Sequence, residues 1–282
     1  MRRIAFVVPV FLLIAASLYA QAPHWSTSGC TDEESSAGNA WVNGWGWGQQ
    51  ERVCEVRRTV LPLKGGQINI TGKNGGIHIL GEDRSDVALV ATVTAFASSK
   101  AKAEQVESQV KILTDGTIHD EGPFTSGWFF RSGYSVDYTV HVPRHVSAEL
   151  HTVNGGIDIA QVDGSLRAET TNGGLAFKDV AGDMRGETIN GGIKVYLAGD
   201  SWHGAGLHAQ SVNGGIVLTV PDGYSAHLVT RTVNGGITLK FPVTVRGDLK
   251  NHLDATLGKG GATIDLETTN GGVSIAHGDG VD

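Results

Sequence analysis

Three glutamates occupy the same position of a repeated segment, where they could act together. Glu169, Glu187 and Glu267 each stand three residues before an Asn-Gly-Gly triplet. Lyases and hydrolases attack polysaccharides with paired carboxylates, and Glu169 and Glu187 should lie about 5 Å apart on neighbouring strands. Arg167 and Arg185 precede two of these glutamates, so the alternative is a solvated face of weak Arg–Glu pairs. We favour the solvated face and predict no catalytic residue.

Aromatic residues gather in two segments outside the later repeats. Aromatic rings pack against the apolar faces of sugars and contribute strongly to binding energy at interfaces. The sequence therefore predicts ligand-binding anchors at Trp41, Trp45, Trp47, Trp128, Phe129 and Phe130. The alternative is that these rings cover the open end of the fold, and the sequence leaves that alternative open.

Other kinds of chemistry find little support in the sequence. Asp158 follows the apolar residue of one repeat, but no Asp recurs there in the others, so calcium is not expected in the turns. Neither a Gly-Lys-Ser/Thr phosphate loop nor a Gly-x-Ser-x-Gly elbow occurs. We predict no metal and no cofactor. The net charge of −7 argues against nucleic acid or anionic lipid as a partner.

The Asn-Gly-Gly triplet is the element that positions these residues. Counted from the Asn, the third and fifth following residues are always apolar, whereas the fourth is variable. This is the period of a strand with one buried face. The triplet occurs seven times, beginning at Asn74, Asn154, Asn172, Asn190, Asn213, Asn234 and Asn270.

A second strand precedes each of the last six triplets. The second, fourth and sixth residues before the Asn are mostly small, apolar or hydroxyl-bearing and should face inward, while the third should face water. Each unit is therefore predicted as strand, turn, strand. Asn and Gly tolerate left-handed dihedrals, so a turn is expected at the triplet, with Gly173 at positive φ. The inward Thr should bond the backbone or its stacked neighbour, and the Asn side chains should form a ladder.

The intervals between triplets indicate a stack of coils. From Asn154 onward they are 18, 18, 23, 21 and 36 residues. A period of this length is typical of a solenoid, in which each coil covers the next. Because 36 is twice 18, one coil should lack its triplet, with residues 251–253 in that place. We predict an all-β fold, a single-stranded parallel β-helix or β-solenoid, with one short helix near residues 98–108.

The chain divides into three parts. Residues 1–22 have the basic start, short apolar core and Ala-rich end of a signal peptide, which predicts export to the periplasm, outer cell surface or extracellular space. Residues 23–50 are expected to form an irregular Trp/Gly-rich flap, and residues 51–282 the β-solenoid. Cys30 and Cys54 are the only cysteines, and an exported chain favours a disulfide between them.

Several of these segments carry a family resemblance. The segment Gly-Gly-Gln-Ile-Asn-Ile at 65–70, the short charged helix, residues 134–143 and Thr-Val-Asn-Gly-Gly-Ile at 152–157 resemble the DUF4097-like adhesin family of exported bacterial β-solenoid proteins. The resemblance covers roughly residues 51–276. It implies a non-enzymatic envelope or surface protein that binds glycan or protein, or serves as a scaffold. A carbohydrate-active β-helix enzyme is the alternative, and a partner in envelope-stress sensing is a third.

Overall fold

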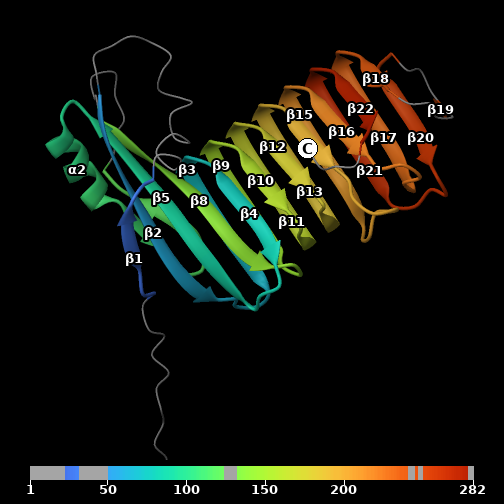
Figure 1. Ribbon diagram of the computed structural model, residues 1–282. Coiled ribbons are helices and arrows are strands. Elements are labelled where there is room, and N and C mark those ends of the chain that lie inside the picture. Colours follow the sequence, from blue (N-terminus) through green and yellow to red (C-terminus); the bar gives the residue numbers. More distant parts are fainter. Residues whose placement is uncertain (1–22, 32–49, 124–131, 241–244, 247–249, 279–282) are drawn as a thin grey trace, which may run out of the picture.

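The molecule is a β-solenoid built from two facing sheets of 11 strands each (Figure 1). This computed structural model describes residues 23–31, 50–123, 132–240, 245–246 and 250–278. Within those ranges most of the chain is strand, and the one helix is α2 (Lys100–Gln109). The predicted fold class and the short helix are therefore confirmed. None of the helical structure in the described ranges is long and apolar enough to cross a membrane.

Sheet A carries the strand that follows each triplet and extends into an antiparallel N-terminal part. In spatial order it contains β1 (Ser26–Gly29), β2 (Glu51–Pro62), β5 (Asp86–Ala97), β8 (Gly133–Pro143), β4 (Ile77–Glu82), β10 (Ile157–Ala160), β12 (Leu175–Lys178), β14 (Ile193–Tyr196), β16 (Ile216–Val220), β22 (Val273–His277) and β18 (Ile237–Leu239).

Sheet B carries the strand that precedes each triplet. In spatial order it contains β19 (Val245–Arg246), β20 (His252–Leu257), β17 (Ala226–Asn234), β21 (Thr263–Asn270), β15 (Gly206–Asn213), β13 (Ala181–Asn190), β11 (Asp163–Asn172), β9 (Ser147–Asn154), β3 (Gln67–Asn74), β7 (Ile118–Glu121) and β6 (Lys111–Leu113). A coil is thus one strand of sheet B, a triplet turn and one strand of sheet A.

The core is a continuous row of apolar side chains between the two sheets. Ile157, Ile193 and Ile216, which follow their triplets at the predicted spacing, have no exposed surface. The period-two pattern is therefore confirmed. At one place in the core a large side chain faces a glycine. A Cβ on Gly186 would come within 2.6 Å of the Phe177 ring, so this glycine makes room for the ring.

Polar side chains bond each triplet to the next along the stack. In the last six triplets, the residue two before the Asn carries a buried hydroxyl that donates to the carbonyl of the first Gly of the neighbouring triplet, as Thr170 does to Gly155 at 2.8 Å. Each Asn amide after that of Asn74 likewise donates to the Asn of the neighbouring coil, so the expected ladder is confirmed. In spatial order the ladder runs Asn74, Asn154, Asn172, Asn190, Asn213, Asn270, Asn234, with distances of 2.8–3.0 Å.

The first glycine of each triplet is required by the stacking of backbones. A Cβ on Gly173 would lie 2.0 Å from the carbonyl oxygen of Gly155, and the other triplets that stack on a triplet show the same approach. Only Gly75, in the first triplet, has positive φ, at 119°. The expectation that Gly173 lies at positive φ was wrong, because the close approach of the neighbouring coil, rather than the dihedral, excludes a side chain.

The last coil of the chain lies inside the stack. Strands β21 and β22 pair in parallel with β15 and β16 on one side and with β17 and β18 on the other. In Figure 1 the red β22 accordingly lies between β16 and β18. Residues 251–253 do not replace a triplet: β20 begins at His252 and pairs antiparallel with β17, next to the edge strand β19 of sheet B. The expectation of a coil at this point was therefore wrong.

The N-terminal end carries a disulfide and the helix. Cys30 and Cys54 are bonded with their Cα atoms 5.6 Å apart, as predicted. Residues 26–29, expected to be irregular, form β1 and pair antiparallel with β2. The Arg57 guanidinium donates to the Val110 carbonyl at 2.5 Å and so ties β2 to the end of α2.

Candidate functional site

The outward glutamates of sheet B lie side by side but are not free. Glu169 and Glu187 are direct partners in the β11–β13 ladder, which confirms that they are one coil apart. The Nε of Arg167 bonds Glu169 Oε1 at 2.6 Å, and Arg185 bonds Glu187 in the same way. Each carboxylate therefore has a guanidinium partner on its own strand, which is the solvated arrangement that the sequence favoured.

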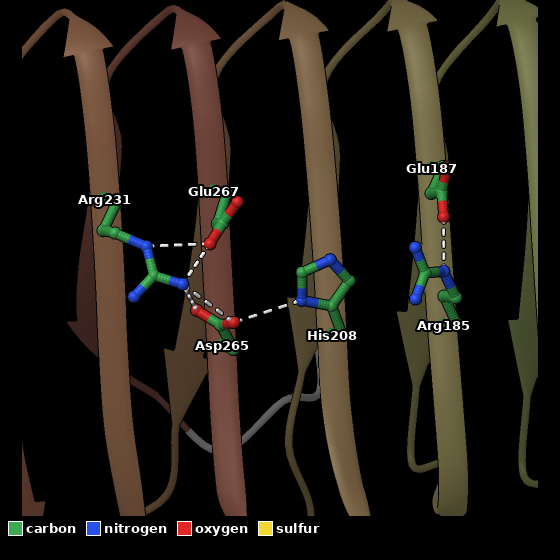
Figure 2. A network of polar contacts seen from close by, with 6 residues as sticks. All are labelled: Arg185, Glu187, His208, Arg231, Asp265 and Glu267. Atoms are coloured by element: carbon green, nitrogen blue, oxygen red, sulfur yellow. Dashed lines mark hydrogen bonds and ion pairs between the residues drawn. The ribbon is translucent and has the colours of Figure 1, made fainter.

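The third glutamate belongs to a larger network near the C-terminal end. Because β21 is inserted, Glu267 lies between Gln210 of β15 and Arg231 of β17. Arg231 Nε bonds Glu267 Oε1 at 2.8 Å, and its Nη2 lies 3.2 Å from both oxygens of Asp265. Asp265 also accepts from the His208 ring at 3.2 Å (Figure 2). The pKa of Arg231 is raised, chiefly by its hydrogen bond to Glu267, so the guanidinium remains charged.

A depression of about 410 Å³ lies over this network. Its lining comes from β15, β21, β17 and the start of β20, which are neighbouring strands of sheet B. The lining residues are Gln210, Ser211, Arg231, Thr232, Val233, Asn251, His252, Glu267, Thr268 and Thr269. We call this depression the C-terminal groove.

Two parallel rows of side chains form the C-terminal groove. One row crosses four strands and holds Gln210, Glu267, Arg231 and His252, each opposite the next in the ladder. All four end in a planar hydrogen-bonding group. The other row, two residues further along each strand, includes Thr269 and the 70% exposed Val233. The groove therefore has a polar edge and a methyl-lined edge.

Histidine–carboxylate pairs cross from strand to strand along the solenoid. None of them was predicted from the sequence, because the partners are far apart in the chain and meet only once the coils are stacked. The pairs, from ring nitrogen to carboxylate oxygen, are His78–Asp158 (2.8 Å), His141–Glu82 (2.6 Å), His145–Asp163 (3.3 Å), His151–Glu169 (3.9 Å), His208–Asp265 (3.2 Å), His227–Asp254 (2.9 Å) and His277–Asp222.

His78 shows how such a pair responds to its surroundings. Its hydrogen bond to Asp158 raises the pKa of the imidazole, burial lowers it, and the charge of Asp137 adds to the increase. Asp137 itself accepts a hydrogen bond from the Gly76 N–H at 2.8 Å, while burial raises the pKa of its carboxyl group. The side chains of His78 and Asp158 are each about half exposed, so the pair contributes little to stability.

The predicted aromatic anchors cannot be placed on this framework. Trp41, Trp45, Trp47, Trp128, Phe129 and Phe130 all lie outside the described residues. Among the residues that are described, no group of three or more His, Cys, Asp or Glu is arranged to hold a metal ion. Sequence reasoning did place Glu267 and Arg231 at the same outward position, but it missed their contact and the contribution of His252.

Several solved structures are similar to this chain at low sequence identity. A "putative cell adhesion protein" from Clostridium sporogenes is 11% identical, with 82% of this chain and 100% of that chain covered and a TM-score of 0.41. A "putative adhesin" from Bacteroides fragilis is 11% identical, with 79% and 96% covered and a TM-score of 0.31. A "putative lipid binding protein" from Parabacteroides distasonis is 11% identical, with 84% and 98% covered and a TM-score of 0.31. No function follows from similarity at this level.

No family model matches the sequence, and no curated protein matches it.

Proposed function

We propose that this protein acts outside the cytoplasm as a non-enzymatic, adhesin-like binding protein of the DUF4097-like kind. The disulfide supports this location, since such bonds persist in oxidising compartments. The predicted signal peptide at residues 1–22 is consistent with export to the periplasm, the outer surface or the medium. The partner is a glycan or a protein of the envelope or cell surface, and the outer face of sheet B is the surface that meets it.

The observation that carries the proposal is the pairing of the outward carboxylates. A glycosidase needs one carboxyl group that holds a proton and a second that acts as base or nucleophile. Glu169 and Glu187 each accept from an arginine two residues earlier, and Glu267 accepts from Arg231. A guanidinium partner favours the ionised carboxylate, which opposes a role as general acid. The arrangement suits recognition better than the alternative of a lyase or hydrolase.

The aromatic segments remain part of the proposal as a second contact region. Trp41, Trp45 and Trp47 carry large rings that suit a sugar or a protein hot spot. If they are anchors, replacing Trp45 and Trp47 by Ala should abolish binding and leave the melting temperature nearly unchanged. If they cap the fold instead, the same change should lower stability by about 3 kcal/mol or more.

A glycan array and an envelope-protein pull-down, both with residues 23–282, test the proposed function. We expect saturable binding to at least one surface component, with the bound glycan recovered intact. Release of shortened or unsaturated sugar products over time would contradict the non-enzymatic assignment. Absence of saturable binding to every glycan and envelope protein would contradict the binding role.

A further inference from the structure

We propose that the C-terminal groove is a binding site for a neutral saccharide, recognised through its ring hydroxyls. This inference rests on the proposed binding function and deepens it by naming the ligand class and its location. The groove exists because two unrelated elements meet there. The inserted strand β21 brings Glu267 between Gln210 and Arg231, and the antiparallel strand β20 adds His252 beyond them. The site is thus a product of the non-sequential order of the coils.

The polar edge of the groove alternates donors and acceptors. The Gln210 amide both donates and accepts, Glu267 accepts, the Arg231 guanidinium donates, and the His252 ring offers two nitrogens for hydrogen bonds. A ligand that satisfies such a row must itself offer donors and acceptors at closely spaced points. A row of sugar hydroxyls does this, because each hydroxyl donates one hydrogen and accepts through two lone pairs.

The opposite edge fits the other part of a sugar ring. Val233 and Thr269 present methyl groups, and Val233 is 70% exposed. A pyranose ring has polar hydroxyls at its rim and C–H groups on its faces. When it lies between the two rows, its hydroxyls meet the polar edge while its apolar face covers these methyls. The volume of about 410 Å³ falls within the range of small-ligand sites, which is roughly 300–1,000 Å³.

Charge selects against other ligand classes. Arg231 and Glu267 bond each other and cancel within the lining, and Asp265 lies against Arg231 as well. An anionic ligand would meet the carboxylate of Glu267, and the Arg231 guanidinium that could attract it is already bonded to Glu267 and Asp265. A cationic ligand would meet that same guanidinium. An apolar ligand would leave the planar groups unpaired, which is costly. An extended peptide finds no free strand edge on β15, β21 or β17, because each of these strands is paired on both sides.

Isothermal titration calorimetry with the mature chain tests the assignment. The probes are neutral cello-, malto- and chito-oligosaccharides, with oligogalacturonate as the anionic comparison. The variant is Gln210→Ala with His252→Ala, whose side chains make no hydrogen bond or ion pair to the rest of the described chain. Gln105→Ala on the exposed face of α2 is the matched control. Thr269→Gln, which narrows the groove without touching Arg231, is a second variant.

We expect at least one neutral probe to bind the unmodified protein and the double variant to bind it about tenfold more weakly or worse, since each lost hydrogen bond is worth about a kcal/mol. Thr269→Gln should also weaken binding, and Gln105→Ala should not. Equal affinity of the double variant and the control would overturn the groove assignment, as would a preference for oligogalacturonate. Saccharide binding lost only in the Trp45→Ala, Trp47→Ala variant would overturn it while leaving the proposed function intact. So would binding of an envelope protein but no saccharide.

Discussion

Replacing Gly173 by Ala should be far more damaging than replacing Gly236 by Ala, although both belong to the same triplet motif. A Cβ on Gly173 would lie 2.0 Å from the carbonyl oxygen of Gly155, whereas a Cβ on Gly236 would have no atom within 4 Å. Neither glycine has a φ in the left-handed region, so the comparison isolates the close approach of coils.

The expected cost follows from what must move. Carbon and oxygen normally approach to about 3.3 Å, so the coils must separate locally by roughly 1 Å. Overpacking of this kind costs about 1–3 kcal/mol. The displaced carbonyl also accepts the buried Thr170 hydroxyl at 2.8 Å, and leaving that group unpaired costs about 1–3 kcal/mol more. We expect a total of about 2–6 kcal/mol for Gly173→Ala. Gly236→Ala should change stability by less than about 1 kcal/mol, in the stabilising direction.

Urea denaturation with linear extrapolation measures both free energies of unfolding. Gly174→Ala provides an intermediate case, because its Cβ would lie 3.0 Å from the Gly192 carbonyl. The three variants should therefore rank by that distance. Equal losses for Gly173→Ala and Gly236→Ala would refute the reasoning. A large loss confined to Gly75→Ala would refute it too, because among the first glycines of the triplets only Gly75 has positive φ.

Three further outcomes are expected. Thr170→Val should cost about 1–2 kcal/mol in urea denaturation, because the Gly155 carbonyl loses its partner; Thr230→Val should cost nothing, because that buried hydroxyl has no partner among the described residues. Asp158→Ser should cost up to about 1 kcal/mol of stability below about pH 6.5, where His78 is protonated and pairs with Asp158. Because the pair raises the pKa of His78, this cost should vanish as the pH rises through the raised pKa. A cost independent of pH would contradict the pair. Reduction of the disulfide should speed hydrogen exchange in β1, whose residues are all exposed, while exchange in β11 and β13 stays unchanged; faster exchange throughout would show that the bond supports the whole stack.

The coil itself was predictable because its determinants are local. An inward position such as Ile157 and an outward one such as Glu169 differ only by the period of two along a strand. The ladder of Asn172 on Asn154 follows once identical turns are stacked. Predicting these features does not require knowing which coils are adjacent. It requires only the assumption that equivalent positions of adjacent coils lie next to each other.

The order of the coils was not predictable from spacing. From Asn190 to Asn213 the chain advances one coil in 23 residues, because an insertion folds back and Trp202 donates to the Gly182 carbonyl at 3.0 Å. From Asn213 to Asn234 it advances two coils in only 21 residues, since the coil of Asn270 lies between them. The number of residues between two triplets therefore does not determine how many coil positions separate them along the stack.

The candidate site was missed for the same reason. The row of the groove contains Gln210, Glu267, Arg231 and His252. Neighbours in this row come from strands that are not consecutive in the chain, so no local pattern brings them together. A one-dimensional repeat predicts what each coil contributes to a face. Which of these side chains become neighbours depends on the order in which the coils stack. At this end of the molecule, that order differs from the order of the coils in the sequence.

The inserted coil also sets the sequence of events in synthesis. Coils up to β15 and β16 can stack as they leave the ribosome or the export channel, each on the one before. Strand β17 can pair with β20, but β17 and β18 cannot yet dock on β15 and β16, because residues 263–277 must lie between. The facing edges of β15, β16, β17 and β18 stay unpaired until almost the whole chain has emerged, and open edges invite pairing with other chains. In an ordinary solenoid the loss of a terminal coil removes one interface. Here a chain cut before residue 263 loses two, and the coil of β17 and β18 is left without its support.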